Sequence, residues 1–258
     1  MDPATIIGIV LAFGAVMVSM VMEGGNPASI LLPPAMLLVF GGTFGVAMAC
    51  GLMKDTAALG GAIKGALASK KHSAEETVTK LVEFAELARR EGLLALEDAA
   101  KSIDDPFIKK GLELAVDGTD PDELREILEA EIATKRSDDK AGAKFFADMG
   151  GFAPTLGIIG TVLGLIHVLE NLSEPEKLGH LIAGAFVATL WGVMSANVFW
   201  LPMASKLKRV AEIEAHHMEL IVEGVLSIQA GANPRIIQQK LLSFLPAKER
   251  PADEDKAA

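Results

Sequence analysis

Two threonines, Thr161 and Thr189, stand inside long apolar segments, and small residues flank each of them. Gly157, Gly160 and Gly164 recur at i, i+3 and i+7, so a helix would carry them on one face beside Thr161. The segment around Thr189 repeats the pattern with three small residues on one face: Ala185, Ala188 and Gly192. Such faces let helices pack closely in lipid. The hydroxyls either bond their own backbone or together line a narrow polar path.

Four apolar segments contain no Asp, Glu, Lys or Arg: residues 4–22, 26–53, 149–169 and 178–205. His167 and His180 lie near the ends of the last two segments. A membrane pathway for ions or protons normally needs an ionisable side chain. If these segments line such a pathway, its carboxylate must therefore come from another chain. The sequence predicts half of a channel, or no channel.

Other polar residues offer weaker candidates. His167 and Glu170 have the i, i+3 spacing of two metal ligands, but two ligands at a membrane edge more often form a polar border, and we predict no metal site. His216 and His217 are adjacent, so we expect them on different faces of a solvated helix. The sequence contains no nucleophile–base constellation and no phosphate-binding glycine loop, so we expect neither an enzyme nor a bound cofactor.

The apolar segments predict an all-α membrane protein with four transmembrane helices. Each segment reaches about 20 residues, the length that crosses a bilayer as a helix, and we place the spans at residues 4–22, 29–53, 149–169 and 180–205. The first is expected to be retained, because the opening Met1-Asp2-Pro3 lacks the basic residues of a signal peptide. The single Cys50 excludes an internal disulfide, and a net charge of −10 gives no reason to expect nucleic-acid binding.

Basic residues are distributed unevenly around these spans. The connection between the first two spans has no Lys or Arg, and that between the last two has only Lys177. Basic residues instead follow the second span, precede the third and follow the fourth: Lys54, Lys64, Lys70, Lys71, Lys140, Lys144, Lys206, Lys208 and Arg209. The positive-inside rule therefore predicts a cytoplasmic N-terminus, a cytoplasmic segment 54–147 and a cytoplasmic tail from residue 206.

The segment 54–147 is predicted to form a domain of short helices. Ser73 and Glu76 fit a capping box, and Asp105-Pro106 and Asp120-Pro121 are typical helix starts. The tail 206–245 is amphipathic, with a break at Gly231 and Pro234. Residues 246–258 are rich in proline and charge and are predicted to be disordered.

Several motifs together resemble one known family. "APTLGIIGTVLGLIHVL" and "AFVATLWGVMSANVFWLPMASKLK" are similar to the third and fourth spans of flagellar stator A subunits (the motility protein A and PomA type), which belong to the MotA/TolQ/ExbB group of ion-driven motor channels. "DGTDPDELREILE" and "EGVLSIQAGANPRIIQQKLLSFL" extend the resemblance over essentially the whole chain. The resemblance implies a multi-pass protein of the bacterial inner membrane whose ion flow drives the flagellar rotor.

The resemblance also implies roles for particular residues. Pro154 and Pro202 would couple ion flow to conformational change, and each proline is expected to kink or end its helix. Arg89 and Glu97, with Arg90 as an alternative to Arg89, would face the rotor switch protein. Without the resemblance, these charges would be a solvated surface. The pathway residues facing the partner would be Pro154, Gly157, Thr161, Gly164 and Thr189.

The implied partners account for the missing carboxylate. A subunits of this family form a ring, understood as a pentamer, around two B subunits that each supply a membrane Asp and a peptidoglycan-binding domain. The implied cargo is H⁺ or Na⁺: the two hydroxyls either replace water around a small cation or bond the partner's protonated Asp. The alternative is an energiser of envelope transport like TolQ or ExbB, although that branch usually has three spans.

Overall fold

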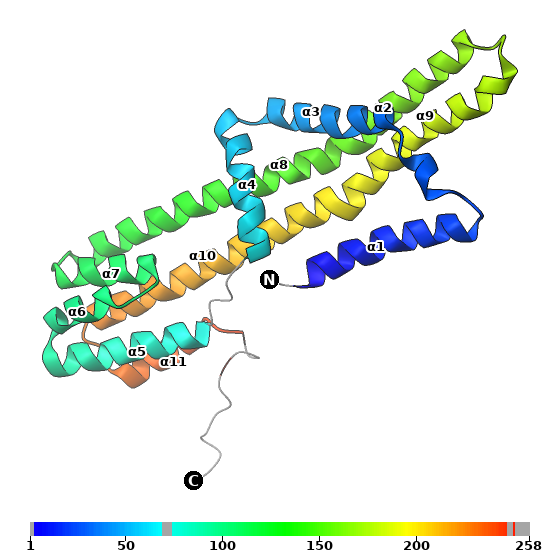
Figure 1. The fold of residues 1–258 in the computed structure, drawn as a ribbon. Coiled ribbons are helices and arrows are strands. Elements are labelled where there is room, and N and C mark those ends of the chain that lie inside the picture. Colours follow the sequence, from blue (N-terminus) through cyan, green and yellow to red (C-terminus); the bar gives the residue numbers. More distant parts are fainter. Residues whose placement is uncertain (1–2, 69–73, 247–249, 251–258) are drawn as a thin grey trace. The chain divides into compact units, whose positions relative to one another are not determined.

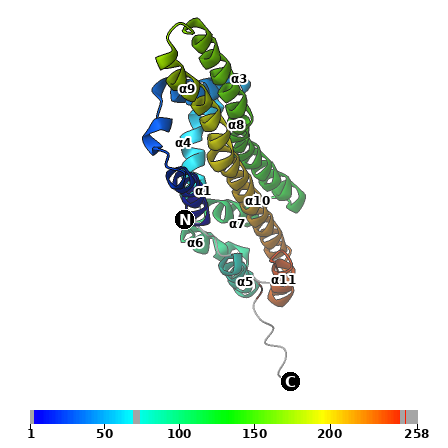
Figure 2. The same cartoon turned by 90° about the vertical axis from the view of Figure 1, so that its right-hand side faces the viewer.

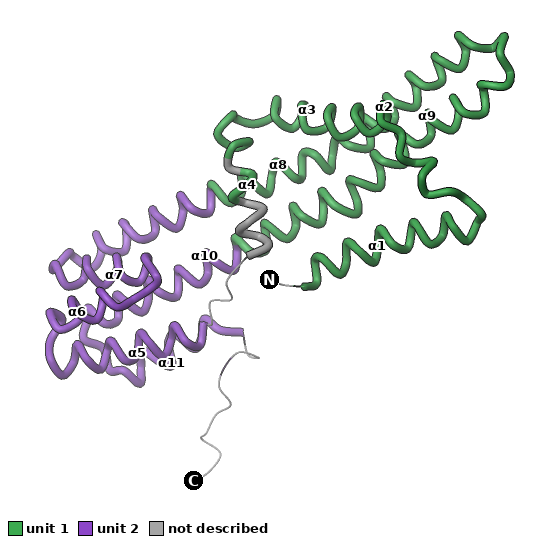
Figure 3. The backbone as a smooth tube through the Cα atoms, viewed as in Figure 1, with its two compact units in different colours: residues 1–69, 138–211 green, residues 70–137, 212–258 purple. Residues whose placement is uncertain are grey.

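The computed structural model describes residues 3–68, 74–246 and 250, and in these ranges the chain consists of helices and connecting turns (Figure 1). The predicted all-α class is confirmed. The chain divides into two compact units (Figure 3). Unit 1 comprises residues 1–69 and 138–211, and unit 2 comprises residues 70–137 and 212–258.

Unit 1 contains the apolar segments. Its elements are α1 (Pro3–Met22), the 3₁₀-helix η1 (Pro27–Ile30), α2 (Pro33–Met36), the π-helix η2 (Leu37–Gly41), α3 (Gly42–Cys50), α4 (Met53–Ala68), part of α8 (Pro121–Glu170), α9 (Pro175–Ser195), the π-helix η4 (Ala196–Trp200) and part of α10 (Leu201–Gln229). Among the described residues, four helical stretches are long and apolar enough to cross a membrane: Pro3–Met22, Pro33–Cys50, Pro121–Glu170 and Pro175–Gln229.

The second predicted span, 29–53, has different helix limits in the structure. Leu32 is extended (φ −101°, ψ 108°) because the following Pro33 disfavours the α conformation, and the helix begins only at Pro33. It ends at Cys50, and α4 begins at Met53. The fourth predicted span, 180–205, lies within a longer helical stretch that begins at Pro175, a residue suited to the first helical turn.

A buried tryptophan ties the connection after α1 to helix α9. The Trp191 indole Nε1 donates a 2.7 Å hydrogen bond to the Ile30 carbonyl oxygen, which satisfies a polar group that would be costly to leave unpaired in lipid. Its ring also packs against Phe13 and Phe40, at centroid distances of 6.4 and 5.5 Å. Trp191 therefore links α9 to α1, to η2 and to the connection after α1.

Unit 2 is a helical domain built from two separate parts of the chain. Its elements are α5 (Ala74–Glu91), the 3₁₀-helix η3 (Leu93–Ala95), α6 (Leu96–Lys101), α7 (Pro106–Val116), the first part of α8, the last part of α10 and α11 (Pro234–Leu242). Its core contains fully buried side chains from the loop between the second and third spans and from the tail. The loop contributes Leu81, Leu112 and Leu128, and the tail contributes Ile221 and Leu241. Loop and tail thus share one apolar core.

This shared core corrects the predicted domain limits. The segment 54–147 does not form a domain by itself: residues 54–69 and 138–147 belong to unit 1, and the tail from residue 212 completes unit 2. Leu59 of α4 is buried in one cluster with Phe145 and Phe146 of α8. This packing explains why both ends of the segment 54–147 belong to unit 1. Ser73 and, apart from Pro246 and Arg250, the tail 246–258 lie outside the described residues.

Helix starts in unit 2 follow the predicted signals. Asp105 accepts hydrogen bonds from the backbone N–H groups of Phe107 and Ile108, at 2.9 and 3.3 Å, and α7 begins at Pro106. α8 begins at Pro121, where Asp120 accepts from the Asp122 N–H. These caps were readable in the sequence because they depend on two adjacent residues only.

Replacing Glu223 by glutamine is expected to destabilise unit 2 by about 1 kcal/mol at neutral pH. Glu223 lies in α10 and bonds both Lys240 of α11 and Arg125 of α8. Partial burial raises its pKa, but the hydrogen bond and charge of Lys240, together with Arg125, outweigh burial and leave the pKa below the usual 4.5. The ionised form is therefore the one that stabilises the fold.

The pH dependence tests this interpretation. A lowered pKa contributes stability above the unfolded pKa, and that contribution disappears as the pH falls through the folded-state pKa. Thermal unfolding of the full chain, followed by circular dichroism, should show a lower midpoint for Glu223→Gln than for wild type at pH 7 and a smaller difference near pH 4. Glu126→Gln, an exposed carboxylate on α8, is the control. Equal midpoints for both variants would contradict the assignment.

Candidate functional site

Helices α8 and α9 lie side by side within unit 1, and their backbones come unusually close (Figure 1, Figure 2). A Cβ atom on Gly157 would lie 2.9 Å from the Ala188 carbonyl oxygen and 3.1 Å from the Thr189 Cα. A Cβ on Gly164 would lie 2.6 Å from the Ala185 Cβ. The small faces predicted on these helices therefore meet each other. No side chain larger than hydrogen fits at these glycines without moving a helix.

The closest part of this contact involves Gly192 and Ala153. A Cβ on Gly192 would lie 2.6 Å from the Ala153 carbonyl oxygen and 3.0 Å from the Gly157 Cα. Ala153, fully buried, was missed in the sequence analysis, although it stands four residues before Gly157 and so extends the same small face.

The two threonine hydroxyls meet at this contact. Thr161 Oγ1 and Thr189 Oγ1 are hydrogen-bonded to each other. Thr161 Oγ1 also lies 3.2 Å from the carbonyl oxygens of Gly157 and Ala185, and Thr189 Oγ1 lies 3.3 Å from that of Gly157. Four oxygens thus converge between α8 and α9, two of them hydroxyl and two carbonyl. Oxygen clusters of this kind can bond a proton-bearing group or coordinate a small cation.

This geometry changes the expectation for the glycines. The resemblance implies that Gly157 and Gly164 make room for a partner's helix, but the space at their Cβ positions is filled by α9 of the same chain. Their role in the structure is tight intrachain packing. Thr161 and Thr189 are only half-buried, so their hydroxyl cluster lies at the edge of this contact. The other side of α8 is apolar and exposed, for example at Ile158, Val162 and Ile166.

Pro154 was predicted to kink or end its helix, and the structure shows that it does not end it. It stands inside α8, which continues from Pro121 to Glu170. Proline removes a backbone donor and crowds the carbonyl four residues earlier, which here belongs to Gly150. The Gly150 Cβ position is occupied by Leu201, only 2.4 Å from its Cδ2 atom, so close packing against α10 supports the helix there.

Pro202 does not end its helix either, and the structure shows why. The π-helix η4 (Ala196–Trp200) immediately precedes it, and the Leu201 N–H bonds the Ala196 carbonyl five residues back. The extra residue in this turn makes room for the proline ring, as π-bulges do in other helices. The Asn197 side chain donates a 2.8 Å hydrogen bond to the Val193 carbonyl oxygen near the same turn. The chain therefore continues without a break into α10.

The predicted rotor-facing charges gather around one turn of unit 2. Arg89 and Arg90 are exposed in the last turn of α5, and Glu97 is exposed in the first turn of α6. Both placements suit the helix dipoles. Glu97 lies 3.5 Å from Lys101, a mostly solvated ion pair. Leu94 lies in η3, between these two helices in the sequence, and is a 74% exposed apolar side chain that the sequence analysis did not single out.

The histidines behave differently from one another. His167 Nδ1 lies 3.4 Å from Glu170 Oε2 with both side chains exposed, and the described residues hold no group of three or more potential metal ligands. His216 and His217, predicted to be solvated, both make contacts: His216 Nε2 lies 2.9 Å from the Phe244 carbonyl oxygen, and His217 Nε2 lies 3.4 Å from Thr77 Oγ1. His216 is nevertheless exposed, as predicted, whereas His217 is only partly exposed because it lies against α5.

Comparison with known proteins decides the family. Residues 99–220 match the MotA/TolQ/ExbB proton channel family, and residues 6–92 match the family described as Motility protein A N-terminal. The chain is 41% identical to Motility protein A of Bacillus subtilis, with 97% of this chain and 93% of the relative covered. This chain belongs to the MotA/TolQ/ExbB proton channel family.

Other relatives and solved structures agree with this assignment. The chain is 36% identical to the chemotaxis protein PomA of Vibrio alginolyticus over 99% of this chain and all of the relative. Its fold matches a structure of C. jejuni MotAB with a TM-score of 0.93 at 33% identity, covering 98% of this chain and 100% of the other. It matches the flagellar MotAB stator complex of Bacillus subtilis with a TM-score of 0.87 at 40% identity, covering 95% and 97%. Family membership and the four apolar helices identify a multi-pass inner-membrane protein.

Proposed function

We propose that this chain is the A subunit of a bacterial flagellar stator, which forms an ion channel with a B subunit and converts ion flow into torque on the rotor. The observation that carries the proposal is the match over nearly the full length of both chains to MotAB stator structures. The motility protein A match at residues 6–92 and four candidate spans favour this branch over a TolQ- or ExbB-like energiser.

The B subunit would supply the acidic group that this chain lacks. The apolar windows of all four candidate spans contain no Asp, Glu, Lys or Arg, so a membrane carboxylate must come from the partner. A single-span B subunit with a membrane Asp and a peptidoglycan-binding domain fits this need. We propose a pentameric ring of A subunits around two B subunits, set in the lipid bilayer, with both termini and unit 2 in the cytoplasm as the basic residues indicate.

The transported ion is H⁺ or Na⁺, and no other cofactor is proposed. The hydroxyl cluster of Thr161 and Thr189 serves either ion, because hydroxyl oxygens replace water around Na⁺ and also bond a protonated carboxyl group. Pro154 precedes this cluster by two turns in α8, and Pro202 follows it along the chain beyond α9. We propose that these two prolines transmit the conformational change at the hydroxyl cluster to α10. Close packing against Leu201 supports the helix at Pro154, and the π-helix η4 accommodates Pro202.

Co-purification tests the partnership. An affinity-tagged copy of this chain, expressed at its natural level, should co-purify with a B subunit that carries a membrane Asp and a peptidoglycan-binding domain. The purified complex should contain more copies of this chain than of the B subunit, in the five-to-two ratio of the proposed ring. Recovery of a TolR- or ExbD-like partner instead would replace the stator proposal with the envelope-energiser alternative.

Charge reversal at Glu97 is expected to impair swimming while the stator remains assembled. We propose that Arg89 or Arg90 and Glu97 engage the rotor switch protein through complementary charge. Removing one rim charge of such a contact costs about 1 kcal/mol, or about a fivefold loss of affinity, and reversal costs more. The measurement is the swimming speed of a Glu97→Lys strain, alongside the amount of stator complex recovered from its membranes.

Glu113→Lys provides a matched control for this prediction. Glu113 lies on α7 and forms an exposed i, i+4 pair with Lys109 at 3.9 Å, similar to the pair of Glu97 with Lys101. If Glu113→Lys slowed swimming as much as Glu97→Lys, the effect would arise from net charge, and the rotor-facing role of Glu97 would be lost.

A further inference from the structure

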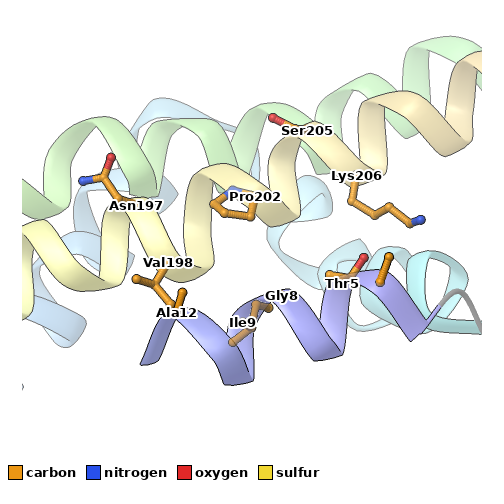
Figure 4. A pocket seen from close by; sticks show the side chains of 10 residues that line it. Thr5, Gly8, Ile9, Ala12, Asn197, Val198, Pro202, Ser205 and Lys206 are labelled. Carbon is orange, nitrogen blue, oxygen red and sulfur yellow. The ribbon is translucent and has the colours of Figure 1, made fainter. Parts of the chain in front are cut away.

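Exposed apolar side chains have different causes in the two units. In unit 1 most of them lie on the candidate spans, for example on α1 beside its open groove with α10 (Figure 4), and the bilayer accounts for them. Among the described residues of unit 2, three large apolar side chains are exposed: Leu94 (74%), Ile236 (59%) and Ile213 (55%). Leu94 is the most exposed of the three. It lies in the turn that joins α5 to α6, five residues after Arg89 and three before Glu97.

The turn around Leu94 is fixed by packing on both sides. Gly92 follows the last residue of α5 with φ 88°, a left-handed value that glycine adopts without strain. Leu96 is fully buried in the core of unit 2, and Leu93 packs against that core. The 3₁₀-helix η3 also packs against α5, α6 and α7. Two leucines of the turn are thus anchored inside, and the third is presented to solvent on a preorganised backbone, which lowers the entropic cost of binding it.

The charges around Leu94 restrict what can cover it. Three exposed carboxylates lie within four residues of it along the chain, at Glu91, Glu97 and Asp98. An anionic lipid surface would repel them. Unit 2 of a second copy is also a poor match, because acidic residues outnumber basic ones in this unit. With Arg89 and Arg90 exposed at the end of α5, the turn instead matches a protein surface that places charges of both signs around an apolar depression.

We infer that Leu94 is an apolar anchor of the contact with the rotor switch protein, seated in an apolar depression of that protein which charged residues surround. This inference rests on the proposed stator function, and it adds an apolar contact to the charges assigned there. Fully desolvated side chains near the centre of an interface carry most of its affinity, whereas charges at the rim mainly set specificity and the rate of association. Burying one leucine side chain therefore strengthens the contact more than one solvated ion pair does.

Binding measurements at two salt concentrations test this inference. The purified stator complex, with its B subunit, is immobilised, and the affinity of the purified rotor switch protein is measured at low salt and at about 1 M salt, where charges are screened beyond about 3 Å. Leu94→Ala is expected to weaken binding about tenfold at both salt concentrations, because most of the buried leucine surface is lost. Glu97→Lys is expected to weaken binding at low salt and much less at high salt.

Ile236→Ala is the matched control, because Ile236 is an exposed apolar side chain of the same volume class on α11. Its removal should leave the affinity unchanged, and Leu94→Met, which keeps an apolar side chain of similar size, should retain most of the wild-type affinity. Equal affinities for Leu94→Ala and Ile236→Ala would overturn the inference, as would a loss for Leu94→Ala that disappears at high salt. A wild-type complex that does not bind the rotor switch protein at all would contradict the stator proposal itself, which is a separate outcome.

Discussion

Replacing Gly192 by alanine is expected to stop most cells from swimming and to reduce the recovered stator complex at least about fivefold. The added Cβ would lie 2.6 Å from the Ala153 carbonyl oxygen and 3.0 Å from the Gly157 Cα, and both are backbone atoms. The two helices must therefore move apart, which also separates the Thr161 and Thr189 hydroxyls. The measurements are swimming in soft agar and the amount of complex in purified membranes.

Gly151→Ala is the control for this substitution. Gly151 lies in α8, two residues before Ala153, but no atom lies within 4 Å of its Cβ position. Alanine is also the better helix former, so this change should be neutral or slightly stabilising. If Gly192→Ala assembled and swam as well as Gly151→Ala, the close contact of α8 and α9 would not be a requirement for function.

Replacing both Thr161 and Thr189 by valine is expected to lower ion-driven swimming by about tenfold while leaving the complex assembled. Valine keeps the branched shape but removes both hydroxyl oxygens from the cluster at the α8–α9 contact, a loss of about 1–3 kcal/mol of hydrogen bonding or ion coordination. Swimming speed at several external sodium concentrations and fixed pH is the measurement. A speed that depends on sodium in wild type favours Na⁺ as the transported ion, and an independent speed favours H⁺.

Two comparisons separate the oxygen cluster from packing. Thr155→Val removes a hydroxyl from the same helix, but Thr155 is exposed and donates only to the Phe152 carbonyl oxygen at 2.7 Å, so swimming should not change. The double Thr→Ser variant keeps both oxygens and should retain most of the speed. A valine double variant that swims at the wild-type speed would contradict the proposed role of the cluster.

Features encoded by neighbouring residues were predictable from the sequence. The apolar segments, the Asp-Pro helix starts and the small faces of α8 and α9 each depend on short-range spacing, and the structure contains them. The meeting of Thr161 with Thr189 was not evident, because a sequence pattern does not determine how two helices are rotated about their axes. For the same reason, the sequence did not show that α9 of the same chain, and not a helix of the partner, fills the space beside Gly157.

Features that depend on distant parts of the chain were harder to predict. The tail joins the loop in one core only because Ile221 and Leu241 are buried beside residues such as Leu81, and this pairing has no local signature. The π-helix η4 before Pro202 was also not predicted. It relieves the clash between the proline ring and the preceding turn, which was expected to end the helix instead. His217 was assigned to solvent for the same reason, because its partner Thr77 lies on α5.

The most direct test of the stator proposal is the swimming of a strain in which this gene is deleted and no other stator genes remain. We predict cells with normal filaments that do not swim, and restoration of swimming by the intact gene. Restoration should fail with Gly192→Ala and succeed with Gly151→Ala. A deletion strain that swims normally would contradict the proposal that this chain drives the flagellar rotor.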